Sequence, residues 1–221
     1  MAIQALVFDA YGTLFDVSSV IERCNRHFPG KGNQISEIWR IKQLEYTWLT
    51  SLMGQFRGFW DLTDAGLRFA CHSLSLELKE NIRHDLMNNY LFLTPYPEVR
   101  TTLENLSGKI QLAILSNGTQ PMLDAVVGNA GISHLMDQVL SVDEVKIFKP
   151  SPKVYQLAAD RLNLSKDQIG FVSSNAWDAA GAKAFGFQVF WINRFQRPME
   201  ELDLEPDYNI STLDQVIPKI Q

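Results

Sequence analysis

The sequence predicts an α/β fold in which a doubly wound parallel sheet is interrupted by a helical insert. Residues 3–8 have the pattern of a buried strand, residues 16–93 show helical periodicity without strands, and strands alternate with helices after residue 94. Such alternation is typical of a parallel sheet covered by helices. We therefore expect residues 1–15 and 94–221 to form the core, with residues 16–93 as a helical unit that covers the carboxyl edge of the sheet.

The opening apolar run, residues 3–8, is too short for a helix and leads into a turn around Gly12. We expect it to be a buried strand with Asp9 at its carboxyl tip. In the insert we expect four helices, indicated by one apolar stripe at helical spacing and by glycine-containing loops. The stripe consists of Ile38, Ile41, Leu44, Trp48 and Leu52, and the loops are marked by residues 29–32 and Gly54.

The second part of the chain is expected to supply the remaining strands and the helices that cover them. Capping residues Thr119, Ser151 and Asn175 indicate three helix starts, and Gly131 and Gly186 indicate two helix ends. Residues 201–221 have the pattern of a connecting segment, a short strand and a last helix. The other strands are predicted at residues 110–115, 138–140, 169–172 and 188–191.

Composition favours a small-molecule partner over nucleic acid or a membrane. The chain has 221 residues, 46% of them hydrophobic, and a formal net charge of −5 with scattered basic residues, so it offers no cationic patch. The sequence contains no apolar run long enough to span a membrane and no signal-peptide pattern, which predicts a cytoplasmic protein. Cys24 and Cys71 lack metal-ligand spacing and are expected to be reduced core residues.

Polar segments follow several predicted strands at the edge where open parallel sheets bind ligands. They are Asp9, residues 116–118 (Ser-Asn-Gly), Lys149 before a proline, and residues 173–178. Each segment alone is equally typical of a turn or a helix cap. Their order at matching strand ends, beneath an insert placed to cover them, favours one shared site.

These four segments resemble the four motifs of the haloacid dehalogenase superfamily, and the resemblance spans essentially the whole chain. The longer strings at residues 8–15, 39–48, 115–118 and 172–178 are similar to those of the L-2-haloacid dehalogenases. This resemblance implies a Rossmann-like core with an inserted helical cap domain and hydrolysis of small 2-haloalkanoic acids with release of halide. It also implies a homodimer that needs no cofactor and no metal.

Two departures favour a dehalogenase over the phosphatases of the same superfamily. Those phosphatases carry a second Asp two residues after the nucleophile, where this chain has Tyr11, and an acidic metal ligand where it has Ser174. Halide is a stable leaving group that needs no proton, and a haloacid brings only one negative charge. The absent acid and metal ligand therefore fit substitution at a carbon that bears halogen.

Asp9 is the candidate nucleophile, and Lys149 would favour its charged form. We expect the Ser116 hydroxyl and nearby backbone N–H groups to bind the substrate carboxylate. Asp178 would orient or deprotonate the water that cleaves an ester on Asp9. Each has an alternative reading from the residues alone, because Lys149 could be a solvated surface residue and Asp178 a carboxylate at a helix terminus.

Further roles come from the resemblance. Arg40, assisted by Asn117, would stabilise the departing halide, although by itself the pattern reads as a solvent-facing charge on a helix. Ser173, Asn175 and Lys149 would hold Asp178. The resemblance also implies that Thr13 and Tyr155 support Asp9 and the basic cluster, and that Lys149, Asn117 and Asn175 contact the substrate. It implies an apolar wall made of Tyr11, Leu44, Phe59 and Trp177. Ile41 departs from the family, whose members carry Gln at this position.

Two other functions stay open from the sequence. A metal-dependent phosphatase is opposed by Tyr11 and Ser174, and activity that survives strong chelation would separate it from a dehalogenase. A catalytically silent module that binds a small carboxylate is opposed by the retention of Asp9, Arg40, Lys149 and Asp178. Failure to release halide from any 2-haloacid would favour that second alternative.

Overall fold

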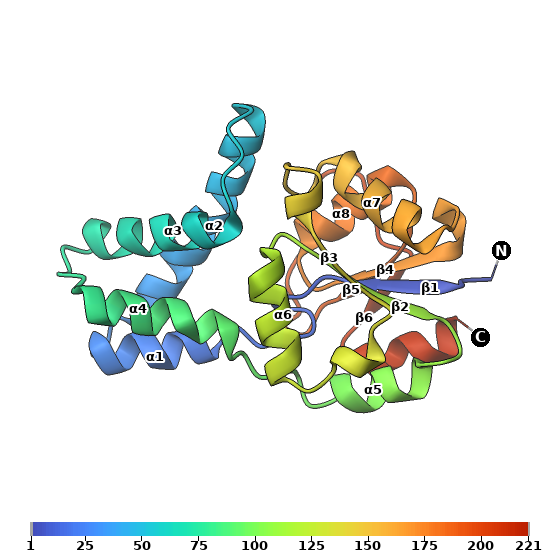
Figure 1. Ribbon diagram of the computed structural model, residues 1–221, viewed down its shortest axis with the longest axis horizontal. Helices are drawn as coiled ribbons and strands as arrows, with labels where there is room; N and C mark the ends of the chain where they lie inside the picture. The colour runs from blue at the N-terminus through green and yellow to red at the C-terminus, as the bar shows by residue number, and fades with distance from the viewer. Residues whose placement is uncertain (1, 221) are drawn as a thin grey trace.

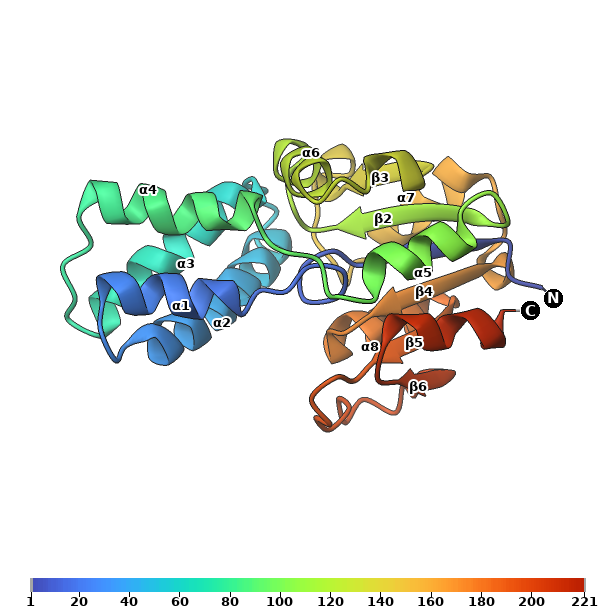
Figure 2. The same cartoon turned by 90° about the horizontal axis from the view of Figure 1, so that it is seen from below.

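A parallel six-stranded sheet forms the centre of the larger lobe of this computed structural model, which describes residues 2–220 (Figures 1 and 2). The strand order is β3-β2-β1-β4-β5-β6, and every neighbouring pair is parallel. The predicted α/β fold class is confirmed. The strands are β1 (Ala5–Phe8), β2 (Gln111–Ser116), β3 (Gln138–Ser141), β4 (Ile169–Ser173), β5 (Gln188–Ile192) and β6 (Tyr208–Ile210).

The first strand is the central one because its side chains are apolar on both faces. All four residues of β1 are fully buried, as expected for a strand covered by helices on both sides. Strand β1 pairs with β2 on one side and β4 on the other, so the direction of strand addition reverses there. Asp9 follows β1, which places it at the topological switch point, where open α/β sheets bind ligands.

Helices cover both faces of this sheet. Helix α5 (Val99–Leu106) packs against the 3-10 helix η5 (Leu213–Lys219) on one face, whereas α7 (Pro152–Leu162) packs against α8 (Ala176–Phe185) on the other (Figure 1). Helix α6 (Gln120–Asn129) lies beside β3, at the side nearer the second lobe. The short strand predicted near the C-terminus is β6, but the predicted last helix is 3-10 in type and contains Pro218, and residue 221 lies outside the described range.

The smaller lobe consists of helices from the predicted insert. These are α1 (Ser19–His27), α2 (Gly32–Leu52), α3 (Phe59–Ser73) and α4 (Glu80–Asn88), followed by the 3-10 turn η1 (Asn89–Leu91). Two chain segments cross between the lobes (Figure 2), and they bind each other through Asp16 N to Thr94 O at 2.8 Å and Tyr96 N to Leu14 O at 3.0 Å. The two crossings therefore form one paired connection.

The face that α2 buries differs from the apolar stripe seen in the sequence. Its buried residues are Gly32, Ile35, Trp39, Gln43, Thr47 and Thr50. Two members of the stripe are exposed instead, Ile41 by 54% and Leu52 by 85%. The helical period was predicted correctly, but polar side chains that find hydrogen bonds inside the lobe can occupy the buried face. Thr47 and Thr50 donate to the Leu44 and Tyr46 carbonyls of their own helix.

The residues predicted to begin and end helices lie at the expected positions, but the predicted capping hydrogen bonds are not formed. Thr119, Ser151 and Asn175 stand at the N-caps of α6, α7 and α8, but their side chains make no capping hydrogen bond. Gly186 ends α8 with φ +108°, and Gly131 follows α6 with φ +65°. These glycines lie where the sequence predicted helix ends.

Both cysteines are buried and unbonded within the lobe of α1 to α4. Burial raises the pKa of Cys24 to about 12, with a further contribution from nearby Cys71, and burial raises that of Cys71 to about 11. Neither thiol is therefore activated as a nucleophile. Among residues 2–220, no helix is long and apolar enough to cross a lipid bilayer.

The contact between α1 and α2 gives a stability prediction. A Cβ at Gly32 would lie 2.4 Å from the Ile21 carbonyl oxygen and 2.5 Å from Asn25 Cγ. We expect Gly32→Ala to lower the free energy of unfolding by about 1–3 kcal/mol in urea titration, because the two helices must separate. Gly128→Ala in α6 is the matched control, since its Cβ would meet nothing within 4 Å. That variant should gain about 0.5–1 kcal/mol, and equal effects at both sites would contradict the packing argument.

Candidate active site

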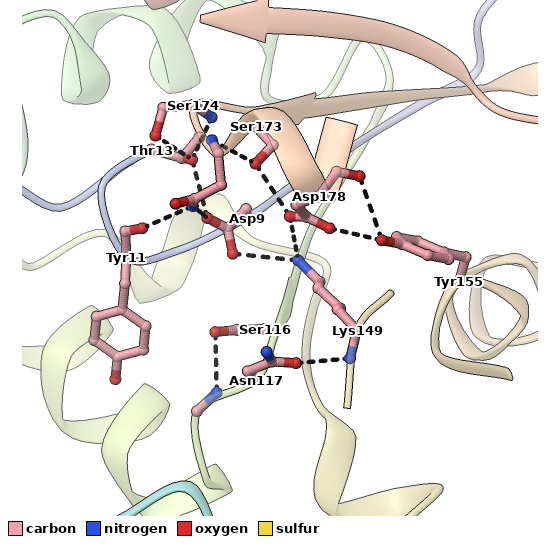
Figure 3. A network of polar contacts seen from close by, with 12 residues as sticks. Asp9, Tyr11, Thr13, Ser116, Asn117, Lys149, Tyr155, Ser173, Ser174 and Asp178 are labelled. Carbon is pink, nitrogen blue, oxygen red and sulfur yellow. Dashed lines mark hydrogen bonds and ion pairs between the residues drawn. The ribbon is translucent and has the colours of Figure 1, made fainter. Parts of the chain in front are cut away.

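The carboxyl ends of β1, β2 and β4 bring the predicted polar residues into one cluster (Figure 3). Asp9 follows β1, Ser116 ends β2 and Ser173 ends β4. Lys149 lies just before α7, and Asp178 lies in the first turn of α8. All five are buried, although such groups are usually exposed, so each must find partners inside the protein.

Lys149 is the centre of this cluster. Its ammonium donates to Asp9 Oδ1 at 3.2 Å and to Asp178 Oδ2 at 2.9 Å, and its side chain is fully buried. Burial alone would lower the pKa of Lys149, but the two carboxylates outweigh burial, and the net direction is upward. Lys149 therefore carries a full positive charge at neutral pH. An ammonium has three protons, so one remains for another acceptor.

Asp178 is held from two sides. Lys149 and the Ser173 hydroxyl both donate to Oδ2, the latter at 3.1 Å, and the Tyr155 hydroxyl donates to Oδ1 at 2.8 Å. Burial raises the pKa of Asp178, and Asp9 adds to this, while Lys149 opposes it. Burial also raises the pKa of Tyr155, so its phenol stays a proton donor. Asp178 is thus a buried carboxylate with more affinity for a proton than an exposed one has.

The support of Asp9 differs in detail from the sequence-based expectation. Thr13 Oγ1 and Asn175 Nδ2 both approach Asp9 Oδ2, at 3.0 and 2.8 Å. The Asn175 side chain was expected to hold Asp178 but contacts Asp9, whereas Tyr155 supports the cluster through Asp178. Because a carboxylate oxygen has two lone pairs, Oδ2 is saturated. Oδ1 accepts only from Lys149 and keeps a lone pair free.

The turn after β2 offers further donors. Gly118 N donates to Ser116 Oγ at 3.1 Å, which leaves the Ser116 hydroxyl proton available. Asn117 Oδ1 accepts from Lys149 N at 3.0 Å, and this bond fixes the amide so that its NH₂ group is the free end. Both side chains are buried next to the cluster (Figure 3). Their donors suit an anionic group.

The helical lobe contributes Arg40 from α2. Its Nη2 lies 3.3 Å from Asn175 Oδ1 in the larger lobe, and its Nη1 donates to Gln43 Oε1 at 2.7 Å. Arg40 is partly buried, so the structure does not support the alternative of a solvent-facing charge. The sequence analysis missed Gln43. Its position three residues after Arg40, on the same helix face, was the signal that could have found it.

Aromatic rings form an apolar wall beside the cluster. The Tyr11 ring stacks on Phe59 at 6.0 Å and lies 6.1 Å from Tyr90, and Phe59 lies 6.2 Å from Phe148. Tyr90 and Phe148 were missed. Tyr90 lies in a segment without a polar motif, and an apolar residue such as Phe148, next to the Lys149 motif, looks like ordinary core. Burial, with Tyr90 and Asp9, raises the pKa of Tyr11, so its hydroxyl is neutral.

One phenol and two indole groups of this region have no hydrogen-bond partner among the described residues. They are Tyr11 Oη, Trp48 Nε1 and Trp177 Nε1, and all three atoms are buried. The Trp177 ring meets Trp48 of α2 edge-on at 5.6 Å. Leu44, also predicted for the wall, is partly buried on α2 one turn after Arg40.

A second ion pair fixes the loop that follows β1. Arg194 Nη2 donates to the Thr13 carbonyl at 3.1 Å, and Nη1 pairs with Glu98 Oε1 at 2.5 Å. The guanidinium also lies 3.9 Å from the centre of the Tyr96 ring. No sequence signal pointed to Arg194. Its contacts tie the loop of Asp9 to the chain that returns from the helical lobe.

The donor set of the cluster does not suit a divalent metal. Ser174 stands where a third carboxylate would be needed, and the Lys149 ammonium already lies between Asp9 and Asp178. Within residues 2–220, no group of three or more His, Cys, Asp or Glu side chains is arranged to hold a metal ion. Magnesium and calcium require several oxygen ligands, whereas here a lysine balances the carboxylate charge.

Comparison with known proteins identifies close relatives. The family model described as haloacid dehalogenase-like hydrolase matches residues 3–186. The chain is 52% identical over 215 residues to (S)-2-haloacid dehalogenase 2 of Pseudomonas sp. (strain CBS-3), covering 97% of this chain and 94% of that one. A crystal structure of an L-2-haloacid dehalogenase matches with a TM-score of 0.98 and 44% identity, with full coverage of both chains.

A further solved structure is informative about chemistry. It is the L-2-haloacid dehalogenase of Xanthobacter autotrophicus with chloropropionic acid covalently bound, which matches with a TM-score of 0.94 and 38% identity. The alignment covers 99% of this chain and 98% of that one.

The central lysine gives a prediction about stability and pH. In Lys149→Met, Asp9 and Asp178 lose the cation between them, so the pair must hold a shared proton when folded. The pKa of the pair is then raised on folding, and the unfolded chain binds fewer protons than the folded one. We therefore expect the free energy of unfolding to fall by about 1.4 kcal/mol per pH unit, starting near pH 4 and ending where the folded pair loses its proton.

Urea titrations at a series of pH values measure this slope. Lys183→Met is the matched control, since Lys183 pairs with Asp207 at 2.7 Å on the surface and both side chains are about one-third exposed. It should add no such slope. Parallel profiles for Lys149→Met and the wild-type protein would contradict the proton-sharing argument.

Proposed function

The chain belongs to the haloacid dehalogenase-like hydrolases, and on that premise we propose that it hydrolyses small L-2-haloacids to 2-hydroxy acids through an ester on Asp9. The observation that carries this proposal is the buried pair of Asp9 and Lys149 in a site where Tyr11 and Ser174 occupy the positions of the second acid and the acidic metal ligand of the phosphatases. The Asp9 oxygen with a free lone pair is Oδ1, on the side of Lys149. A relative that holds chloropropionic acid covalently supports an ester intermediate.

In the first step, Asp9 Oδ1 attacks the substrate carbon that carries the halogen. A bond forms between Oδ1 and this carbon, and the halide leaves with the electron pair of the broken bond. Attack from the face opposite the halide inverts the carbon. Thr13 and Asn175 hold Oδ2, so the carboxylate is fixed in orientation before the substrate arrives.

Two different sets of charged and polar groups around Asp9 bind the substrate carboxylate and the departing halide. We assign the substrate carboxylate to the Ser116 hydroxyl, neighbouring backbone N–H groups and the third proton of Lys149. The departing halide lies against Arg40, with the free NH₂ group of Asn117 assisting. The small alkyl part of the substrate is surrounded by Tyr11, Leu44, Phe59 and Trp177. Asn175 lies next to the reacting carbon and the halide, because it contacts both Asp9 and Arg40.

In the second step, water cleaves the ester. Its oxygen attacks the Asp9 carboxyl carbon while Asp178 orients it or takes its proton, which the raised pKa of this carboxylate favours. The bond between the carboxyl carbon and the ester oxygen breaks, and this oxygen leaves as the hydroxyl of the product. Tyr155 and Ser173 hold Asp178 during this step. The reaction consumes one water and releases halide and one proton.

The proposal also covers the domain boundaries of the chain and its oligomeric state. We place the catalytic core at residues 1–15 and 94–221 and the cap at residues 16–93. Leu49, Leu52 and Met53 at the end of α2, with Phe69 of α3, are exposed apolar side chains and would suit the interface of a homodimer. A cytoplasmic location also stays a prediction.

A single turnover in heavy-oxygen water tests the covalent route. With protein in excess, the label is expected in the Asp9 carboxylate and not in the 2-hydroxy acid, because water attacks the ester at the protein carbon. Peptide mass spectrometry locates the label. Asp9→Asn should lower halide release by at least about a thousandfold, since the amide is a poor nucleophile. Label found directly in the product would refute the ester.

Chelation separates this function from a metal-dependent phosphatase. Because Tyr11 and Ser174 stand where the phosphatases carry acidic groups, halide release from L-2-chloropropionate should be unchanged by excess chelator. Halide is measured with an ion-selective electrode before and after dialysis against the chelator. Activity that disappears and then returns with Mg²⁺ would contradict the proposal.

A further inference from the structure

Two polar side chains are fully buried between helices of the cap. Gln43 lies on α2 and Thr63 on α3, and neither is exposed to solvent. A buried amide or hydroxyl costs free energy unless it is hydrogen-bonded, so such residues have partners or a function. The hydrogen bonds of Gln43 and Thr63 connect them to Arg40, which lies at the candidate active site.

The hydrogen bonds form a chain with a fixed direction. Thr63 Oγ1 donates to the Phe59 carbonyl at 2.7 Å, which uses its only proton. It must therefore accept from Gln43 Nε2, 2.7 Å away. The amide orientation follows, and Gln43 Oε1 faces Arg40 Nη1 at 2.7 Å. The other end of the guanidinium reaches Asn175, which contacts Asp9.

The partner of Arg40 is neutral. Among residues 2–220, its guanidinium forms no ion pair, and its two hydrogen-bonded partners are amide oxygens. A carboxylate at position 43 would hold Arg40 equally well but would neutralise it. The amide instead fixes the side chain while leaving its charge available to an anion.

We propose that Gln43 and Thr63 are positioning residues that hold Arg40, uncompensated, at the place where halide leaves. This inference rests on the proposed function of the site. The amide sets the position of the guanidinium, the threonine sets the orientation of the amide, and the α3 backbone anchors both. The relay acts on the carbon–halogen step and not on hydrolysis of the ester.

Two variants break the relay in different ways. Gln43→Glu keeps the shape and the contact with Arg40, but it places a negative charge beside the guanidinium and replaces the donor to Thr63 Oγ1 with an acceptor. Thr63→Val keeps the volume but leaves Gln43 Nε2 without its acceptor. The matched control is Thr47→Val, which removes an equally buried hydroxyl of α2 that donates to the Leu44 carbonyl and lies outside the relay.

The test is the rate of halide release in a single turnover with L-2-chloropropionate and L-2-iodopropionate. Chloride is the poorer leaving group and concentrates more charge, so it depends more on Arg40. Both relay variants should slow the chloro substrate by about threefold to tenfold and the iodo substrate less. In an Arg40→Ala background, Thr63→Val should have no further effect, because interacting residues are non-additive.

Other outcomes separate the proposals. Equal slowing of both halides, or an additive loss in the Arg40→Ala background, would overturn the positioning role and indicate a merely structural one. Thr47→Val should leave the chloro-to-iodo ratio unchanged. If Thr63→Val does not fold, Gln43→Glu decides by the same ratio. A wild-type protein that releases neither halide would instead overturn the proposed function itself.

Discussion

The buried ammonium of Lys149 is the interaction on which the site depends. It joins two carboxylates that come from different elements, one after β1 and one in α8. Without a cation, two buried carboxylates at this spacing could not both be ionised. The lysine therefore holds the residue after β1 and the first turn of α8 together through one cation. Asn117 holds the lysine backbone, which adds the end of β2 to the same arrangement.

The position of the cap depends on the same loop after β1. Arg194 binds the Thr13 carbonyl and stacks on Tyr96, so the segment that carries Asp9 and the paired connection to the cap are fixed together. The cap is also held against the larger lobe by Arg40, whose guanidinium forms a hydrogen bond with Asn175 of that lobe. The site that we propose therefore draws on both lobes. Asp9, the proposed nucleophile, lies in one lobe, and Arg40, to which we assign the halide, is held by helices of the other.

Most of the fold could be predicted because buried parallel strands are short apolar runs that end at turns. The polar residues at their ends were predicted for the same reason, since strand ends meet at one sheet edge. The buried face of α2 could not be predicted from periodicity. Gln43 and Thr47 are buried because their hydrogen bonds are satisfied inside the cap, and a sequence does not show which helices meet. Asn175 was expected to hold Asp178 but binds Asp9, and the sequence could not separate the two because both carboxylates lie within reach of one lysine.

Charge explains why such a site suits a monoanion. The carboxylates of Asp9 and Asp178 exceed the charge of Lys149 by one, and Arg40, which forms no ion pair among residues 2–220, brings the sum of these four charges to zero. A substrate with one carboxylate adds a single negative charge, and the nucleophile loses its own charge when it becomes an ester. The halide that departs then carries the charge that Asp9 has given up. A phosphate dianion would bring one charge more, and this cluster has no further cation or metal-ligand set to balance it. The four charged side chains sum to zero, so a bound monoanion leaves the site with one net negative charge and a dianion would leave two, which makes the monoanion the better fit.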